Sequence, residues 1–146
     1  MRRISIKGVL LGGVVDITSS VVLGIPFAIY ASFHAVLAHT PKDQVGPAIS
    51  ALVNSPPIYL GELVTGLACS VLGGYIAGRI AKHDELLNGA LSSILCLALG
   101  AFTLLSGKDS HSLAVQILLF LASPTFGLLG GYLSLLRRRA MLVAQT

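Results

Sequence analysis

Hydrophobic residues run along this chain in four long blocks that short polar segments separate. The blocks occupy residues 6–38, 58–81, 86–105 and 111–136, and each has the length of about 20 residues or more that a helix needs to cross a bilayer. The pattern therefore predicts an all-α fold, an integral membrane bundle of four transmembrane helices. We expect this single transmembrane domain to cover residues 1–146.

The polar segments predict how the helices are joined. Residues 40–57 are the only sizeable loop, which we expect outside the cell, and residues 48–53 within it can form a short helix at the membrane surface. Residues 82–85 and 106–110 are expected to be tight turns. The four helices then form two hairpins, with Pro26 predicting a kink in the first helix.

Composition agrees with a membrane as the solvent. Hydrophobic residues make up 54% of the chain, charged residues only 11%, and the mean hydropathy is +0.85, whereas a soluble domain has roughly 25% charged residues. The formal charge of +4 raises the question of nucleic acid. The basic residues stand at the ends of the apolar blocks, without interleaved aromatics, so the expected partner is the lipid bilayer and not nucleic acid.

Lysine and arginine predict the orientation, because cytoplasmic flanks of membrane proteins carry an excess of them. Eight of the ten lie on one side of the predicted bundle: Arg2, Arg3, Lys7, Arg79, Lys82, Arg137, Arg138 and Arg139. Only Lys42 and Lys108 lie on the other side. We therefore expect both termini in the cytoplasm and a multi-pass protein of the bacterial inner membrane.

Small residues recur at every fourth position of three predicted helices, which places them on one face of each helix. Such rows let two backbones approach closely in lipid, where packing and weak hydrogen bonds hold helices together. Packing within one chain and self-association of several chains both explain the rows. The glycines expected at helix contacts are Gly8, Gly12, Gly24, Gly66, Gly74, Gly78, Gly127 and Gly131.

A short repeat ends the second and fourth helices. Residues 72–76 read LGGYI and residues 129–133 read LGGYL, each ahead of a basic segment. Duplication of a hairpin and convergence on a packing motif both explain the repeat. Residues 73–91 resemble the hairpin of the second and third helices in small uncharacterised four-helix bacterial inner-membrane proteins. The resemblance implies an inner-membrane location and assigns no activity and no catalytic residue.

Two acids lie inside the predicted spans, where an acidic side chain is costly and usually faces protein or water. Asp16 and Glu62 each belong to the small-residue row of their helix, and helical rise places them roughly 14 Å and 25 Å from the cytoplasmic side. At the depth of Asp16 the second helix offers Cys69 and Ser70. The candidate intramembrane polar site is Asp16, Ser20, Glu62 and Ser70.

These acids have both functional and structural interpretations. Asp16, with or without Glu62, is a candidate for binding a proton or a cation. Alternatively, Asp16 is a carboxyl that hydrogen-bonds between helices, and Glu62 simply reaches the outer interface.

Other chemistry-bearing residues form no recognisable site. The histidines lack metal-ligand spacing, and the sequence has neither a phosphate-binding loop nor a nucleophile–base motif, so we expect no catalytic, cofactor-binding or metal residues. The turn at residues 83–85 is expected to be solvated, with its acids close to Arg79 and Lys82.

The favoured hypothesis is a non-enzymatic membrane protein, an accessory or self-associating structural or stress-related component. Its possible partners are a second copy or another membrane protein. The alternative is a small proton- or cation-coupled transporter or channel that uses Asp16.

Overall fold

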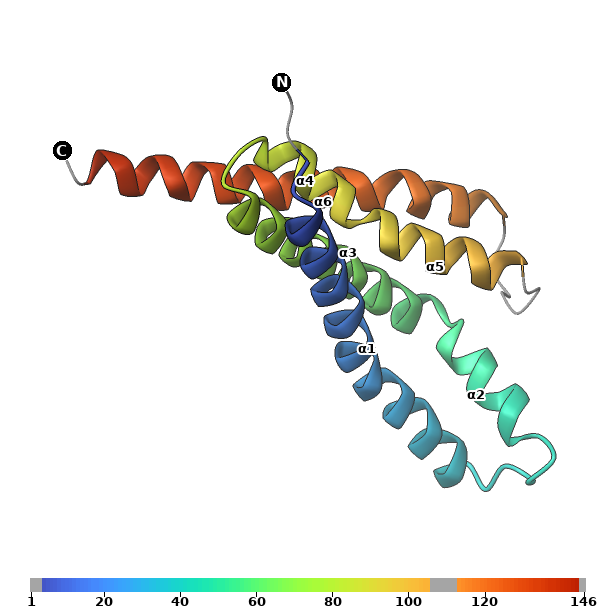
Figure 1. Cartoon of the computed structure of the whole chain (residues 1–146). Coiled ribbons are helices and arrows are strands. Elements are labelled where there is room, and N and C mark those ends of the chain that lie inside the picture. Colours follow the sequence, from blue (N-terminus) through green and yellow to red (C-terminus); the bar gives the residue numbers. More distant parts are fainter. Residues whose placement is uncertain (1–3, 106–112, 145–146) are drawn as a thin grey trace. The chain divides into compact units, whose positions relative to one another are not determined.

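The computed structural model describes residues 4–105 and 113–144, in which all regular structure is helical. The all-α prediction is confirmed for this part of the chain. Its helices, drawn in Figure 1, are α1 (Ile6–Leu37), α2 (Val45–Val53), α3 (Pro56–Ala81), α4 (Glu85–Ser92), α5 (Ile94–Leu105) and α6 (Leu113–Val143).

Helices α1 and α3 coincide closely with the first two hydrophobic blocks, and α2 is the short helix expected in the loop. The third block is divided at Ser93 into α4 and α5, although the Ser93 carbonyl still accepts a hydrogen bond from the Leu97 amide at 2.9 Å. Helix α6 continues to Val143, because its three arginines favour helix and no glycine or proline follows them. The predicted turn at residues 106–110 and the start of the fourth block lie outside the described residues.

The turn between α3 and α4 is as tight as its sequence predicts. Lys82 and Asp84 have φ angles of 56° and 43°, in the left-handed region, which reverses the chain within three residues. The next helix then begins at Glu85.

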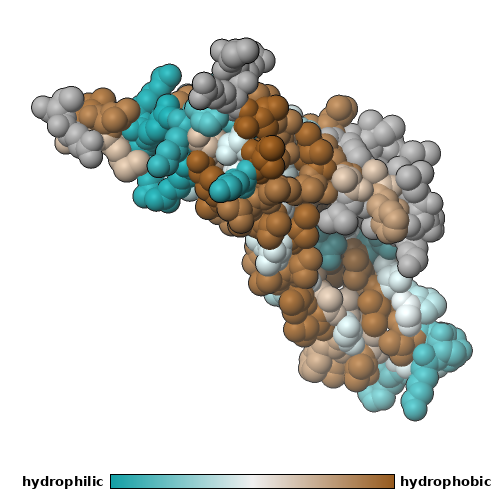
Figure 2. All heavy atoms as spheres, in the orientation of Figure 1, coloured by the Kyte–Doolittle hydropathy of each residue, from teal (hydrophilic) through white to brown (hydrophobic). Residues whose placement is uncertain are grey.

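Two of the described helices are long and apolar enough to cross a membrane. The most apolar stretches of α1 and α3 have mean hydropathies of 1.9 and 1.5, yet only 22% and 28% of these stretches are buried inside the protein. A helix in the core of a soluble protein is mostly buried, whereas these two expose apolar side chains. Figure 2 shows such hydrophobic residues over much of the visible surface. Both helices are therefore compatible with membrane spans.

The chain divides into two compact units, Met1–Ser19 with Leu67–Thr146 and Ser20–Gly66. We call them the first and second unit. In the first unit the beginning of α1 packs against the end of α3 with backbones in direct contact. An ideal Cβ on Gly12 would lie 2.6 Å from the Gly73 carbonyl oxygen, and one on Gly8 would lie 2.8 Å from that of Ala77. Since no real Cβ comes so close, only glycine allows this approach.

Helix α6 contacts α3 and α4 in the same way. A Cβ on Gly74 would overlap the Gly127 carbonyl oxygen, and a Cβ on Gly89 would lie 2.6 Å from that same oxygen. One turn further along α6, Gly131 lies against Gly78 and Glu85. Helices α3 and α6 therefore run parallel in this unit, and α4 runs antiparallel to α6.

Six of the eight predicted packing glycines lie at close contacts in the first unit. The other two, Gly24 and Gly66, belong to the second unit, and a Cβ on either would meet nothing within 4 Å. The expectation of a close contact inside the chain is not met there, because small residues at every fourth position permit an approach but do not supply the neighbouring helix. The structure adds Gly13, Gly73, Gly89 and Gly130 to the close contacts.

The second unit contains the end of α1, α2 and the start of α3. Ala31 and Ala35 of α1 are buried there, and Ala35 shares a shallow pocket with Ala48 and Ala51 of α2. Small side chains of both helices thus line this pocket.

The glycine contacts predict opposite effects for one substitution made at two positions of α3. Gly74→Ala should lower the thermal unfolding midpoint in mild detergent, at a cost of about 1–3 kcal/mol, because the methyl group overlaps Gly127. Gly66→Ala, where the space is open, should be neutral or stabilise by up to about 1 kcal/mol through helix propensity. Equal midpoints for the two variants would contradict the close contact at Gly74.

Candidate functional site

A buried carboxyl lies among the helices of the first unit. Asp16 follows Gly8 and Gly12 on the face of α1 that meets α3, and its side chain is only 1% exposed. Gly73 of α3 makes room for it, because a Cβ on Gly73 would stand 2.8 Å from the Asp16 Cβ. The structure thus places Asp16 inside the protein, as its small-residue row predicts.

Hydroxyl and thiol groups from three other helices surround this carboxyl. The Ser70 hydroxyl of α3 donates a hydrogen bond to Asp16 Oδ2 at 3.1 Å, and the Cys96 thiol of α5 also donates to the carboxyl. The Ser123 hydroxyl of α6 lies 3.4 Å from the Ser70 hydroxyl. Residues from α1, α3, α5 and α6 therefore meet at one point, which we call the Asp16 cluster.

Ser93 connects this cluster to the junction of α4 and α5. Its hydroxyl is fully buried and donates to the Ser123 backbone carbonyl at 3.2 Å. Ser123 precedes Pro124, a residue that cannot donate a backbone hydrogen bond within α6. The two hydroxyls thus lie where the junction of α4 and α5 meets the backbone of α6 just before its proline.

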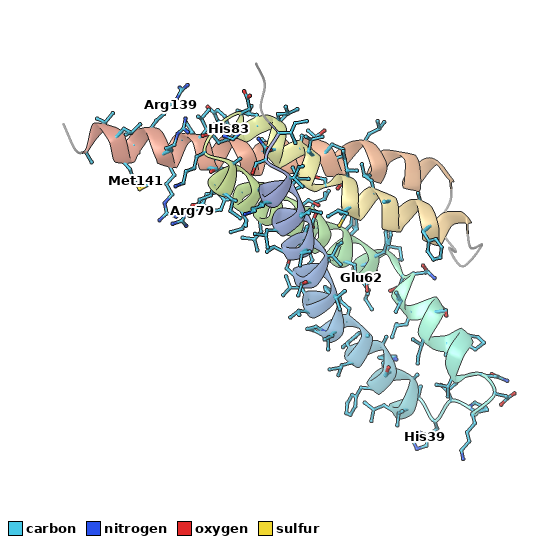
Figure 3. All side chains as sticks on the ribbon, in the orientation of Figure 1. His39, Glu62, Arg79, His83, Arg139 and Met141 are labelled. Carbon is cyan, nitrogen blue, oxygen red and sulfur yellow. The ribbon has the colours of Figure 1, made fainter. Side chains whose placement is uncertain are left out.

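Two residues of the predicted site lie in the first unit and two in the second. Asp16 and Ser70 are in hydrogen-bonding contact, as their predicted depths suggest. Ser20 and Glu62 belong to the second unit, and both side chains are partly exposed. Glu62 is labelled on α3 in Figure 3. The sequence also contains a signal that could place Cys96 near Asp16. Cys96 lies about as many residues after the turn at 82–85 as Ser70 lies before it, so both are expected at a similar depth.

In the Asp16 cluster the carboxyl has neutral hydrogen-bonding partners. Among the described residues, no lysine, arginine or histidine lies within ion-pair distance of Asp16, and no group of three metal-ligating side chains is present. A carboxyl in such surroundings can serve as a hydrogen-bonding centre between helices or as a place where a proton or cation binds.

Glu85 corrects the prediction of a fully solvated turn. His83 and Asp84 are exposed, but Glu85 is only 4% exposed, and its Oε1 lies 2.6 Å from Nη1 of Arg138. The partner is thus on α6 rather than at Arg79 or Lys82. The contact is an ion pair without the alignment of a hydrogen bond, and Arg138 also donates to the Lys82 carbonyl.

Asn88 is a buried polar residue that the sequence did not single out. Its Oδ1 accepts a hydrogen bond from the Ser5 amide at 2.7 Å, and its Nδ2 donates to the carbonyls of His83 and Asp84 at 3.1 and 3.0 Å. Asn88 therefore ties the start of α1 to the turn before α4.

Substitution of Asp16 tests the hydrogen bonds of the cluster. Asp16→Leu should destabilise the protein in mild detergent by about 1–3 kcal/mol, because Ser70 and Cys96 lose their acceptor inside the protein. Asp16→Asn retains the size and an acceptor oxygen and should cost less. Thr18→Leu, two residues away on an exposed position of α1, is the matched control and should change little. A higher unfolding midpoint for Asp16→Leu would rule out the structural role.

Comparison of the chain with models of protein families, with curated protein sequences and with solved structures finds no match. The contacts of the chain itself therefore carry the functional argument.

Proposed function

We propose that the chain is a non-enzymatic, multi-pass protein of the bacterial inner membrane with four spans and both termini in the cytoplasm. Its role is that of an accessory or self-associating component, in which a closely packed helical unit provides a stable body in the bilayer. The observation that carries this proposal is the direct backbone contact of α1, α3, α4 and α6 through glycine, the packing that membrane helices use.

The directions of the helices support four crossings. In the first unit α1 runs antiparallel to α3, while Ser5 lies beside Asn88 and Gly12 beside Ser92, so α1 and α4 run parallel. Helix α6 runs parallel to α3. Two segments pointing one way and two pointing the other are what a bundle with alternating spans requires.

The positions of the cations support the orientation. Arg79, Lys82, Arg137 and Arg138, which the sequence assigns to the cytoplasmic side, line one cavity of the first unit. Lys42, assigned to the outside, belongs to the second unit. A concentration of positive charge at one end of the spans is the pattern expected of the cytoplasmic side. Arg2, Arg3 and Lys108 lie outside the described residues.

Self-association has its own support in the second unit. Gly24 and Gly66 lie on rows of small residues, and the space at their Cβ positions is open within the chain. A second copy, or another membrane protein, is the kind of partner that would fill such positions.

A second candidate function is proton- or cation-coupled transport, which the Asp16 cluster favours. Its carboxyl is buried among hydroxyl and thiol groups from three other helices and has no cationic partner among the described side chains. Acidic residues in such positions mark ion pathways in many membrane proteins. This candidate requires the carboxyl to exchange a proton or cation with both sides of the membrane.

Labelling of introduced cysteines tests the topology. Gln44→Cys should react with a membrane-impermeant maleimide in intact bacteria, while His83→Cys should react only after the membrane is opened. Both positions are exposed, and the native Cys69 and Cys96 lie within the apolar helices, so the parent chain provides the background. A reporter fused after Thr146 should be cytoplasmic. Labelling of His83→Cys in intact cells would overturn the proposed orientation.

Flux through proteoliposomes separates the two candidate functions. If the chain is a structural component, vesicles that contain the parent chain or Asp16→Asn should be no more permeable to protons and sodium than protein-free vesicles. The transport candidate predicts a flux through the parent chain that Asp16→Asn abolishes while the unfolding midpoint is retained. Ser32→Ala, on an exposed position of α1, serves as the matched control.

A further inference from the structure

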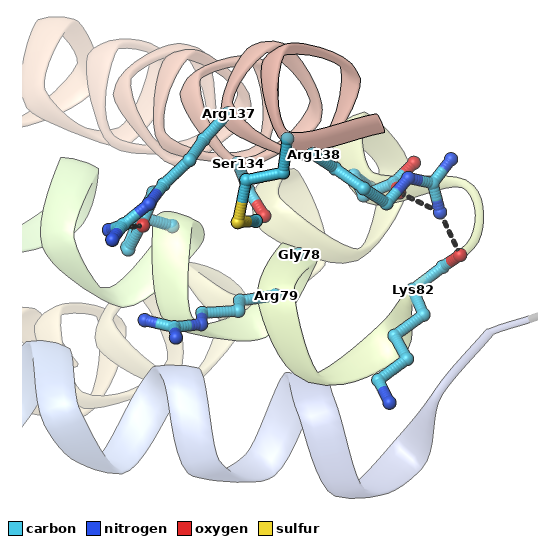
Figure 4. A pocket seen from close by; sticks show the side chains of 9 residues that line it. Gly78, Arg79, Lys82, Ser134, Arg137 and Arg138 are labelled. Atoms are coloured by element: carbon cyan, nitrogen blue, oxygen red, sulfur yellow. Dashed lines mark hydrogen bonds and ion pairs between the residues drawn. The ribbon is translucent and has the colours of Figure 1, made fainter. Parts of the chain in front are cut away.

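The first unit contains a cavity of about 210 Å³ between the end of α3, the start of α4 and the last part of α6. The close-up in Figure 4 shows the side chains that line it. Four of these side chains are cationic and one is acidic. The lining residues that carry the argument are Tyr75, Arg79, Lys82, Glu85, Arg137 and Arg138.

One of the four cations is neutralised within the protein. Arg138 forms the ion pair with Glu85, which is the only carboxylate of the cavity. Arg137 instead donates a hydrogen bond of 2.6 Å to the Tyr75 hydroxyl, which fixes the guanidinium without balancing its charge. Both arginines are thus held in defined positions on α6.

The remaining two cations are exposed and have no carboxylate within ion-pair distance among the described residues. They are Arg79, on the last turn of α3, and Lys82, directly after it. Figure 4 shows Arg79 on the same side of the cavity as Arg137, with Lys82 on the other side. Three uncompensated positive charges therefore surround a space that holds no opposing acid except the paired Glu85, an arrangement suited to a phosphate group.

Apolar side chains lie one or two helical turns before these cations, on the same helix faces. Leu72 precedes Arg79 by two helical turns on α3, and Leu133 precedes Arg137 by one turn on α6. Both leucines are exposed, on the part of each helix that leads away from the basic residues into the apolar stretch. A ligand with an anionic head and hydrocarbon tails matches both the cationic cavity and the apolar surface that follows it. A free anion would use the cationic cavity alone.

We propose that this basic cavity binds the phosphate of an anionic phospholipid headgroup in the cytoplasmic leaflet. The proposal rests on the membrane location and orientation proposed above, in which the ends of α3 and α6 lie at the cytoplasmic surface. Arg79, Lys82 and Arg137 contact the phosphate, and the acyl chains run along the exposed leucines. The Glu85–Arg138 pair keeps α4 and α6 together beneath the headgroup.

The test compares two short-chain lipids that differ in headgroup charge. The delipidated full chain in neutral detergent is titrated with dioctanoyl phosphatidylglycerol or dioctanoyl phosphatidylcholine, and bound lipid is counted by native mass spectrometry. The parent chain should bind the anionic lipid at least about tenfold more tightly. Arg79→Gln and Lys82→Gln should each weaken that binding about fivefold, which is the effect expected for one cation at a membrane surface. Arg79→Lys should retain most of it.

Arg139→Gln is the matched control for net charge. Arg139 is exposed, does not line the cavity, and points in Figure 3 to a different side of α6 from Met141, which does line it. This variant should leave binding of the anionic lipid unchanged. A loss as large as that of Arg79→Gln would show attraction to net charge alone and overturn the site.

Two further results would overturn the proposal. One is equal binding of both lipids by the parent chain, and the other is release of bound phosphatidylglycerol by millimolar inorganic phosphate, which would identify a site for a free anion. If a glutamine variant does not fold, salt dependence in the parent chain still tests the proposal. Added salt should weaken binding of the anionic lipid but not of the zwitterionic one. A chain that labels in the proposed orientation but shows no headgroup preference refutes the cavity alone. A chain that does not insert into the membrane refutes the proposed function and the cavity together.

Discussion

The approach of helix backbones to direct contact is the constraint on which the first unit depends. Gly12 and Gly73 bring α1 against α3, and Gly74 and Gly127 bring α3 against α6. A side chain larger than hydrogen at these positions would meet a carbonyl oxygen of the facing helix. In the bilayer proposed for this chain, lipid offers no hydrophobic force between helices, and dispersion contacts at this short range supply much of the attraction between them.

The close approach of the helices also limits the size of the polar side chains near the Asp16 cluster. Between backbones in contact there is room only for short side chains, and the buried polar positions near the Asp16 cluster are indeed Asp16, Ser70, Ser92 and Ser93. Each of the serines has a hydrogen-bond partner within the protein. Satisfied polar contacts of this kind add directional specificity to an interface that small apolar residues alone would leave free to slide.

The sequence predicts the features that depend on local pattern. Hydropathy alone locates α1 and α3, and helical rise places Ser70 beside Asp16 because depth along a straight helix is simple arithmetic. The division between α4 and α5 at Ser93 is not predicted from the sequence, since the apolar block continues through it. The burial of Glu85 is also missed, because its partner Arg138 lies far along the chain on another helix and a charged turn is usually solvated. Asn88 escapes notice for the same reason, since Ser5, whose amide it binds, lies 83 residues away.

The hydrogen bond between Ser5 and Asn88 has a consequence for the order of assembly during synthesis. The amide of Ser5 leaves the ribosome long before its acceptor, since the two are separated by 83 residues. The start of the first helix therefore waits with this donor unpaired within the protein until the turn before α4 has been made. In the proposed topology this hydrogen bond joins the cytoplasmic ends of the two hairpins, and it can form only when the second hairpin begins to be made.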